Sequence, residues 1–327
     1  MVTKSHREFM YSHILRVIEL KVSSAETGQE SFAWIAPDYG MNLCLLNLTG
    51  DSVINFNLED LIHDFSGTPL LYPTPNRVYQ GRFRYQEKSY VQKKGDFLVT
   101  THGLLYNEPF SVDEVKETEE GVALKGHVDF MAGKPYFEAF PFPHRLSVCF
   151  TLALNSIRFD YQIENHGTEK IPYGIALHPY FSKLDGEDDT LIIAPYQDTY
   201  SNIEEDLIPT GELEKTAGKS TDLTRYRPVG GCDLDHVYTN LPEGAETAIL
   251  YRERGRRIVL EASEEFTHMV IYTPPGMPFF CMENQTCATD AHNLYEKGFI
   301  KESGLKFVNP GTSAEGHVSY RAETSRL

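Results

Sequence analysis

Two polar residues at the ends of apolar segments are candidates for acid–base chemistry. Glu283 follows Phe279-Phe280-Cys281-Met282, where a carboxylate is costly to bury unless it is paired or its pKa is raised, which is how a general base is prepared. His178 stands between Ile175-Ala176-Leu177 and Pro179-Tyr180-Phe181, whose aromatic rings could form a wall of a binding site. The alternatives are a solvent-facing or salt-bridged glutamate and a core histidine bonded to a backbone carbonyl.

Three more polar residues lie in segments rich in turn-forming and aromatic residues. They are His102 in TTHGLLYNEPF, Asp235 in CDLDHVYTN and Arg77 in NRVYQ. Each also has a purely structural interpretation: a turn histidine, an aspartate that closes an Asx turn, and an arginine on the surface or in an ion pair. Because these residues are far apart in the chain, their spacing does not show whether they converge.

Several common catalytic motifs are absent from the sequence. It contains no GxGxxG, GxxxxGK[ST], HExxH or GxSxG pattern and no EF-hand loop, so dinucleotide, P-loop, zinc-protease and α/β-hydrolase chemistry have no sequence support. The five cysteines form no CxxC pair, and no His/Cys cluster has the spacing of structural zinc. We therefore expect reduced thiols, no metal and no organic cofactor.

The elements that must position the candidate residues show a two-residue alternation of apolar and polar side chains. It is clearest over 146–154 and 157–163, which predicts two strands joined by a turn at Asn155-Ser156. Further strands are predicted, mostly bounded by Gly, Pro, Asn or Asp, over 31–36, 42–48, 81–91, 96–101, 121–130, 190–195, 247–252, 256–262, 267–273, 278–283 and 315–321.

Many short strands and little helical pattern favour an all-β fold. The best helix candidate is 56–65, and strands do not alternate with long amphipathic helices as in a parallel α/β fold. We expect a large antiparallel β-sandwich with few short helices. No linker, repeat or low-complexity tract divides the chain, so residues 1–327 are interpreted as a single domain.

The charge balance limits the classes of partner. Among 327 residues, 30 are basic and 47 acidic, and the net charge of −17 makes nucleic acid and anionic membrane surfaces unlikely partners. Charged residues interrupt the first twenty positions and no apolar run reaches 18 residues, so a signal peptide or membrane span is not expected. We expect a cytoplasmic location.

Seven segments, in order, resemble the aldose 1-epimerase (galactose mutarotase) family over roughly residues 30–320. LIPTGE, the His-x-Tyr-Phe string and the Glu-x-Gln-Thr string are the most specific of them. The segments are NRVYQGRF (76–83), THG (101–103), LHPYFSKLDG (177–186), LIPTGE (207–212), LDHVY (234–238), FFCMENQTCATDAHN (279–293) and VNPGTS (308–313).

The resemblance implies a galactose mutarotase-like supersandwich that interconverts sugar anomers without a metal or cofactor. Motif by motif, Glu283 resembles the general base, His178 the general acid and His102 a second histidine at the sugar ring. Asp235 and Arg77, with the adjacent Asn76, resemble contacts to sugar hydroxyls. The implied partner is a monosaccharide, and the protein is expected to be a monomer or a homodimer.

Two departures from the family pattern leave other functions open. Leu104 follows His-Gly where many members have a second glycine, and Pro179 follows the acid histidine where many have Thr or Ser. A non-catalytic sugar-binding or regulatory protein is therefore one alternative. A hexose 6-phosphate epimerase is another, although the expected arginine after His-Gly is absent and the net charge favours a neutral sugar; Arg82 or Arg84 could still supply a phosphate clamp.

Overall fold

The computed structural model, which describes residues 1–54, 56–63, 65–202 and 206–325, folds into two large antiparallel sheets. In order across the first sheet, the strands are β1 (Val2–Tyr11), β2 (Leu15–Ser24), β3 (Glu30–Ala36), β4 (Asn42–Leu48), β5 (Asp51–Ile54), β17 (Tyr180–Ser182), β26 (Phe279–Gln285), β25 (His268–Tyr272), β22 (Asp235–Thr239), β19 (Asp198–Asn202) and β20 (Pro209–Lys215). Two short strands, β16 (Ala176–Leu177) and β6 (Leu70–Leu71), extend it beside β26.

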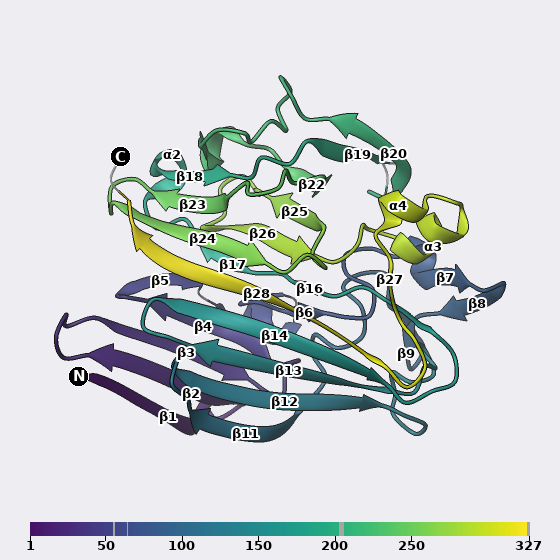
Figure 1. The fold of residues 1–327 in the computed structure, drawn as a ribbon, viewed down its shortest axis with the longest axis horizontal. Helices are drawn as coiled ribbons and strands as arrows, with labels where there is room; N and C mark the ends of the chain where they lie inside the picture. The colour runs from purple at the N-terminus through teal and green to yellow at the C-terminus, as the bar shows by residue number, and fades with distance from the viewer. Residues whose placement is uncertain (55, 64, 203–205, 326–327) are drawn as a thin grey trace.

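The second sheet joins the middle of the chain to its C-terminus, and β28 lies between β14 and β24 (Figure 1). In order, its strands are β11 (Ser111–Glu117), β12 (Val122–Phe130), β13 (His144–Leu152), β14 (Ser156–Asn165), β28 (Ser313–Thr324), β24 (Arg256–Ala262), β23 (Thr247–Tyr251), β18 (Thr190–Ile193) and β21 (Arg227–Pro228).

The remaining elements are short. Three two-stranded ribbons pair β7 (Arg82–Tyr85) with β8 (Lys88–Val91), β9 (Lys93–Lys94) with β10 (Phe97–Leu98), and β15 (Ile171–Tyr173) with β27 (Lys306–Val308). The helices are α1 (Leu58–His63), α2 (Gly186–Asp189), α3 (Ala291–Glu296) and α4 (Ile300–Ser303), with 3₁₀ turns at Tyr79–Gly81 and Val229–Gly231. None of the described helices is long and apolar enough to cross a membrane.

The core fills the space between the two sheets because one face of each strand is apolar. In β13 and β14, Phe150 and Phe159 are directly paired, their ring centroids are 5.2 Å apart, and both are buried. Phe181 of the first sheet meets Tyr320 of the second edge to face at 5.3 Å. Each such buried ring contributes about 1.5–3 kcal/mol of hydrophobic stabilisation, so this layer holds the two sheets face to face.

The predicted antiparallel all-β sandwich is confirmed. The alternating segments over 146–154 and 157–163 are the strands β13 and β14. The helix predicted over 56–65 is observed as α1, which spans Leu58–His63. The single-domain interpretation stays a prediction.

Two expectations about individual elements need correction. Residues 81–91 form not one strand but a hairpin, because Gln86 and Glu87 adopt left-handed φ angles of 49° and 64° and reverse the chain between β7 and β8. Of 96–101, only the short β10 is a strand. The sequence analysis also missed the edge strand β1, whose two faces are both largely exposed and therefore show no alternation.

Three buried histidines make the stability of the fold depend on pH. His144 lies 2.7 Å from the Tyr72 hydroxyl, His268 lies 2.7 Å from the Tyr200 hydroxyl, and His292 lies 3.1 Å from a backbone carbonyl. Burial lowers the pKa of His144 and His292 from 6.5 to about 4 and that of His268 to about 3. Between these values and 6.5, the unfolded chain binds more protons than the folded one, so stability falls as the pH drops.

We expect urea unfolding to show a lower free energy at pH 5.5 than at pH 7.5, by roughly 1 kcal/mol or more for each of the three histidines. The buried Asp290, whose pKa burial raises to about 6, gains a proton in the same interval and offsets part of this loss. His6 is exposed on β1, so His6→Gln serves as the control and should keep the full pH dependence. Equal unfolding free energies at the two pH values in the unmodified protein would contradict the neutral burial of these histidines.

Candidate active site

The central strands of the first sheet bring two candidate residues, Glu283 and Asp235, to one face. Along β26, Phe280 and Met282 point into the core between the sheets, so Glu283 points to the opposite face. Register places Val270 of β25 opposite Glu283, and Tyr272 opposite Asp235 of β22. The site therefore lies on the outer face of the sheet, above the core rather than within it.

His178 reaches the same face from the short connection between β16 and β17. Tyr180, two residues later, pairs with Cys281 of β26, so the imidazole lies beside Glu283. The rings of His178 and Tyr180 stack with centroids 4.9 Å apart, which fixes the plane of the imidazole.

Two loops that pair with each other supply the opposite side. The backbone N–H of His102 donates to the carbonyl of Asn76 at 2.7 Å, and Arg77 forms an isolated β-bridge with Thr101. Asn76 and His102 both adopt left-handed φ angles, 58° and 63°, which are uncommon for residues with a side chain. These turns direct Asn76, Arg77 and His102 toward the strand residues.

Together these elements enclose a cavity of about 220 Å³. All six residues predicted from the sequence line it, namely Asn76, Arg77, His102, His178, Asp235 and Glu283. The structure adds Tyr180, Val270 and Tyr272. Tyr180 belongs to the aromatic segment noted beside His178. Tyr272 had no sequence signal, because only the strand register reveals that it faces Asp235.

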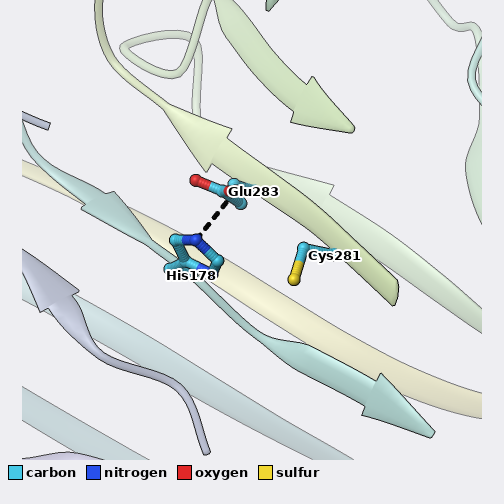
Figure 2. A group of neighbouring side chains, drawn as sticks. All are labelled: His178, Cys281 and Glu283. Atoms are coloured by element: carbon cyan, nitrogen blue, oxygen red, sulfur yellow. Dashed lines mark ion pairs between the residues drawn. The ribbon is translucent and has the colours of Figure 1, made fainter. Parts of the chain in front are cut away.

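A buried polar contact in the cavity joins His178, from the connection between β16 and β17, to Glu283 of β26 (Figure 2). His178 Nε2 lies 3.2 Å from Glu283 Oε1, and the two side chains are 7% and 2% exposed. Burial raises the pKa of Glu283 well above its ordinary value, although Gln285 Nε2 donates to its other oxygen at 3.1 Å. Burial also lowers the pKa of His178, to about 4. Since neither group is stable as a lone buried charge, the pair holds one shared proton.

His102 is a second buried imidazole beside this pair. Its ring lies perpendicular to that of His178, with centroids 5.0 Å apart, and Phe65 contacts its edge at 4.6 Å. Burial, reinforced by the neighbouring His178 and Arg77, lowers the pKa of His102 well below its ordinary value. Within the described part of the chain, the buried Nδ1 atoms of both histidines have no hydrogen-bond partner. His102 is therefore a neutral imidazole.

Arg77 and Asp235 form a looser, half-exposed ion pair at the cavity. The guanidinium lies 3.7 Å from the carboxylate and donates to the side-chain oxygen of Asn76 at 3.1 Å. A pair this long and this exposed is weak. Both partly exposed side chains can also bind the hydroxyl groups of a ligand.

The positions that depart from the family pattern do not line the cavity. Leu104 is fully buried in the core, and its backbone N–H donates to the Tyr72 carbonyl at 2.7 Å. Pro179 is buried and is also absent from the lining. Arg82 and Arg84 occupy the exposed face of β7 and do not reach the cavity either. The two departures therefore do not change which side chains a ligand would meet.

Comparison with known proteins identifies related sequences and folds. A family model described as aldose 1-epimerase matches residues 34–321. The Escherichia coli protein YihR is 23% identical over 239 residues, which are 72% of this chain and 74% of YihR. The chromosomal LacX protein of Lactococcus lactis is 30% identical over 200 residues, 57% of this chain and 62% of LacX.

Solved structures share the fold over the full length. A galactose mutarotase-like protein from Clostridium acetobutylicum superimposes with a TM-score of 0.83 at 20% identity, covering 98% of this chain and 99% of the other. A galactose 1-epimerase from Lactobacillus acidophilus gives a TM-score of 0.77 at 13% identity, covering 100% of both chains.

The turn that holds His102 depends on Gly103, and this dependence can be tested. A Cβ atom at Gly103 would lie 2.4 Å from the Tyr72 carbonyl oxygen, and the φ angle there is +71°. Gly133 has a similar φ of +89° but nothing within 4 Å. Gly133→Ala should therefore cost only the strain of a left-handed residue, about 1–2 kcal/mol.

Gly103→Ala should cost at least about 2 kcal/mol more, because the backbone must also shift. Chemical denaturation of the two variants beside the parent protein measures the difference. Equal losses would show that the close approach of Gly103 to Tyr72 does not constrain the turn.

Proposed function

Because the chain belongs to the aldose 1-epimerase family, we propose that it interconverts the α and β anomers of a free aldose such as glucose or galactose. The observation that carries the proposal is the 3.2 Å contact between His178 Nε2 and Glu283 Oε1 in the cavity. The anomeric oxygen and the ring oxygen of an aldose are bonded to the same carbon. Two groups this close can therefore reach both oxygens of one sugar at once.

The reaction opens and closes a cyclic hemiacetal by two proton transfers. Glu283, as the carboxylate, takes the proton of the anomeric hydroxyl while His178, as the imidazolium, gives its proton to the ring oxygen, and the bond between C1 and the ring oxygen breaks. Rotation about C1–C2 turns the aldehyde over. Reclosure with the roles reversed returns both protons and yields the other anomer, and each general acid or base contributes about 10²–10⁴-fold.

The one-proton pair suits this cycle. Both steps pass a proton between the carboxyl and the imidazole through the sugar, and the total number of protons on the enzyme is the same before and after. Burial favours this net neutral pair over either group alone carrying a charge. Ring opening moves the proton from His178 to Glu283 and so leaves both groups in the uncharged form that burial favours.

The other cavity residues are suited to hold the sugar in place. Asp235 and Asn76 offer oxygen acceptors for sugar hydroxyls, and Arg77 offers guanidinium donors. The neutral His102 offers one further nitrogen beside the ring. Tyr180 and Tyr272 supply aromatic surface against which the apolar face of a pyranose packs.

The charge of the cavity supports an unphosphorylated substrate. Among the described residues that line it, Arg77 is the single cationic side chain, and Asp235 already partners that arginine. A phosphate dianion needs a clamp of several cationic groups, which the exposed Arg82 and Arg84 do not supply here. The five free cysteines, four of them buried, also fit the cytoplasmic location that we propose.

The acid and base roles are tested by Glu283→Gln and His178→Ala. Each variant should lower the rate of anomer exchange by about 10²–10⁴-fold, because each removes one proton transfer. Polarimetry or NMR of freshly dissolved α-D-glucose and α-D-galactose measures the rate. Glu261→Gln, on the exposed face of β24, is the matched control and should leave the rate unchanged.

Full activity in both active-site variants would refute these assignments. Sugar binding by calorimetry together with no acceleration for any free aldose, in the parent protein, would instead indicate a non-catalytic sugar-binding protein.

Substrate charge is tested by comparing glucose with glucose 6-phosphate. We expect kcat/KM to be higher for glucose by at least about tenfold, since the cavity offers the phosphate no charge-assisted hydrogen bonds beyond Arg77. The same NMR exchange measurement serves for both sugars. A preference for the phosphorylated sugar, or its competition with glucose at lower concentration, would overturn the choice of a neutral substrate.

A further inference from the structure

Cys281 lies beside the His178–Glu283 pair and has no part in the proposed reaction. It stands two residues before Glu283 on β26, so both side chains point to the outer face of the sheet. Its backbone is paired with Tyr180, two residues after His178. Figure 2 shows Cys281 and Glu283 on β26, with His178 on the neighbouring segment.

The three side chains form a compact set of metal ligands. A nitrogen of His178, the sulfur of Cys281 and an oxygen of Glu283 all lie within 4.8 Å of one another. All three residues are buried, with Cys281 fully so. Within the described part of the chain, no other group of three or more His, Cys, Asp and Glu residues is as close.

The donor types match zinc rather than a hard cation. Zn²⁺ binds thiolate sulfur at about 2.3 Å, imidazole nitrogen at about 2.0–2.1 Å and carboxylate oxygen at about 2.0–2.2 Å, whereas Mg²⁺ and Ca²⁺ prefer oxygen ligands alone. Tetrahedral bonds of these lengths separate nitrogen from oxygen by about 3.3 Å. The observed distance of 3.2 Å between His178 Nε2 and Glu283 Oε1 already matches this nitrogen–oxygen separation. The Cys281 sulfur lies within 4.8 Å of both atoms, and zinc would have to draw it to about 3.6 Å from them.

Charge balance also suits a divalent ion at this depth. Zn²⁺ with one thiolate, one carboxylate and one neutral imidazole has no net charge, so the buried cluster avoids the cost of an isolated ion. On binding, the thiol proton and the proton shared by the His178–Glu283 pair go to solvent. Two of the three ligands, His178 and Glu283, line the cavity, so an ion bound by them would lie at its wall.

We propose that His178, Cys281 and Glu283 form a Zn²⁺ site that competes with the sugar. The metal takes the Glu283 oxygen and the His178 nitrogen that the anomeric and ring oxygens require, so a zinc-bound chain does not catalyse anomer exchange. Zinc binding itself is independent of the proposed function. Only the inhibition rests on that function.

Binding is tested first, without an activity assay. The metal-stripped protein is titrated with Zn²⁺ against a chromophoric chelator, and with Co²⁺ to detect the absorption of a thiolate–cobalt bond. We expect one Zn²⁺ per chain and a thiolate–cobalt band. In Cys281→Ser, the zinc affinity should fall at least about tenfold and the band should disappear, since even second-shell changes cost about 10–100-fold in affinity.

Cys149→Ser is the matched control. Cys149 is the partly exposed thiol, on β13 of the second sheet, and its loss should change neither the zinc affinity nor the cobalt band. Absence of stoichiometric zinc binding would overturn the proposal. So would a Cys281→Ser variant, shown by its melting transition to be folded, that binds zinc as tightly as the parent protein.

Inhibition is tested in the anomer-exchange assay. Zn²⁺ should raise the apparent KM for the sugar without changing kcat, and Cys281→Ser should keep the basal rate while needing at least about tenfold more Zn²⁺ for the same inhibition. If zinc binds but does not change the activity of an active enzyme, the proposal that zinc competes with the sugar is wrong. An active enzyme that binds no zinc would refute the site and leave the proposed function standing.

Discussion

The organisation of the cavity depends on one buried contact, that between the His178 imidazole and the Glu283 carboxyl. Each group alone would be expensive to place at 7% and 2% exposure, and each shifts its pKa toward the uncharged form. Placed 3.2 Å apart, they hold one proton between them and have no net charge. The surrounding structure serves to keep these two groups together and within reach of a ligand.

One face of the sheet that carries the pair packs into the core, and the other face carries the site residues. Along β26, Phe280 and Met282 pack into the layer between the sheets, while Cys281 and Glu283 face outward. The dense core beneath makes this strand a rigid base, and the rigidity fixes the distance from Glu283 to His178. The same alternation places the Cys281 thiol beside the pair, so one strand supplies both the proposed base and the proposed zinc ligand.

The loops opposite this base are held by backbone geometry rather than by apolar packing alone. Asn76 and His102 adopt left-handed conformations, and Gly103 passes so close to Tyr72 that no side chain fits. These strained positions cluster at the site, where the surrounding hydrogen bonds between the two loops support them. The ligand-binding residues thus come from loops fixed on a rigid sheet.

The sequence by itself determined the fold class and the types of the cavity residues. Alternation in segments such as 146–154 reflects a local requirement, one buried and one exposed face, and is therefore readable without a structure. The motifs that resemble the family identified His178 and Glu283. Tertiary structure alone decided which strands pair. The register of β17 and β25 on β26 brings His178 and Tyr272 near Glu283, and these contacts join segments about 10 to 100 residues apart. Hydrogen bonds between distant segments leave no local pattern, which is why the role of Tyr272 was not predicted. The edge strand β1 was missed for another reason, since both of its faces are largely exposed and show no alternation.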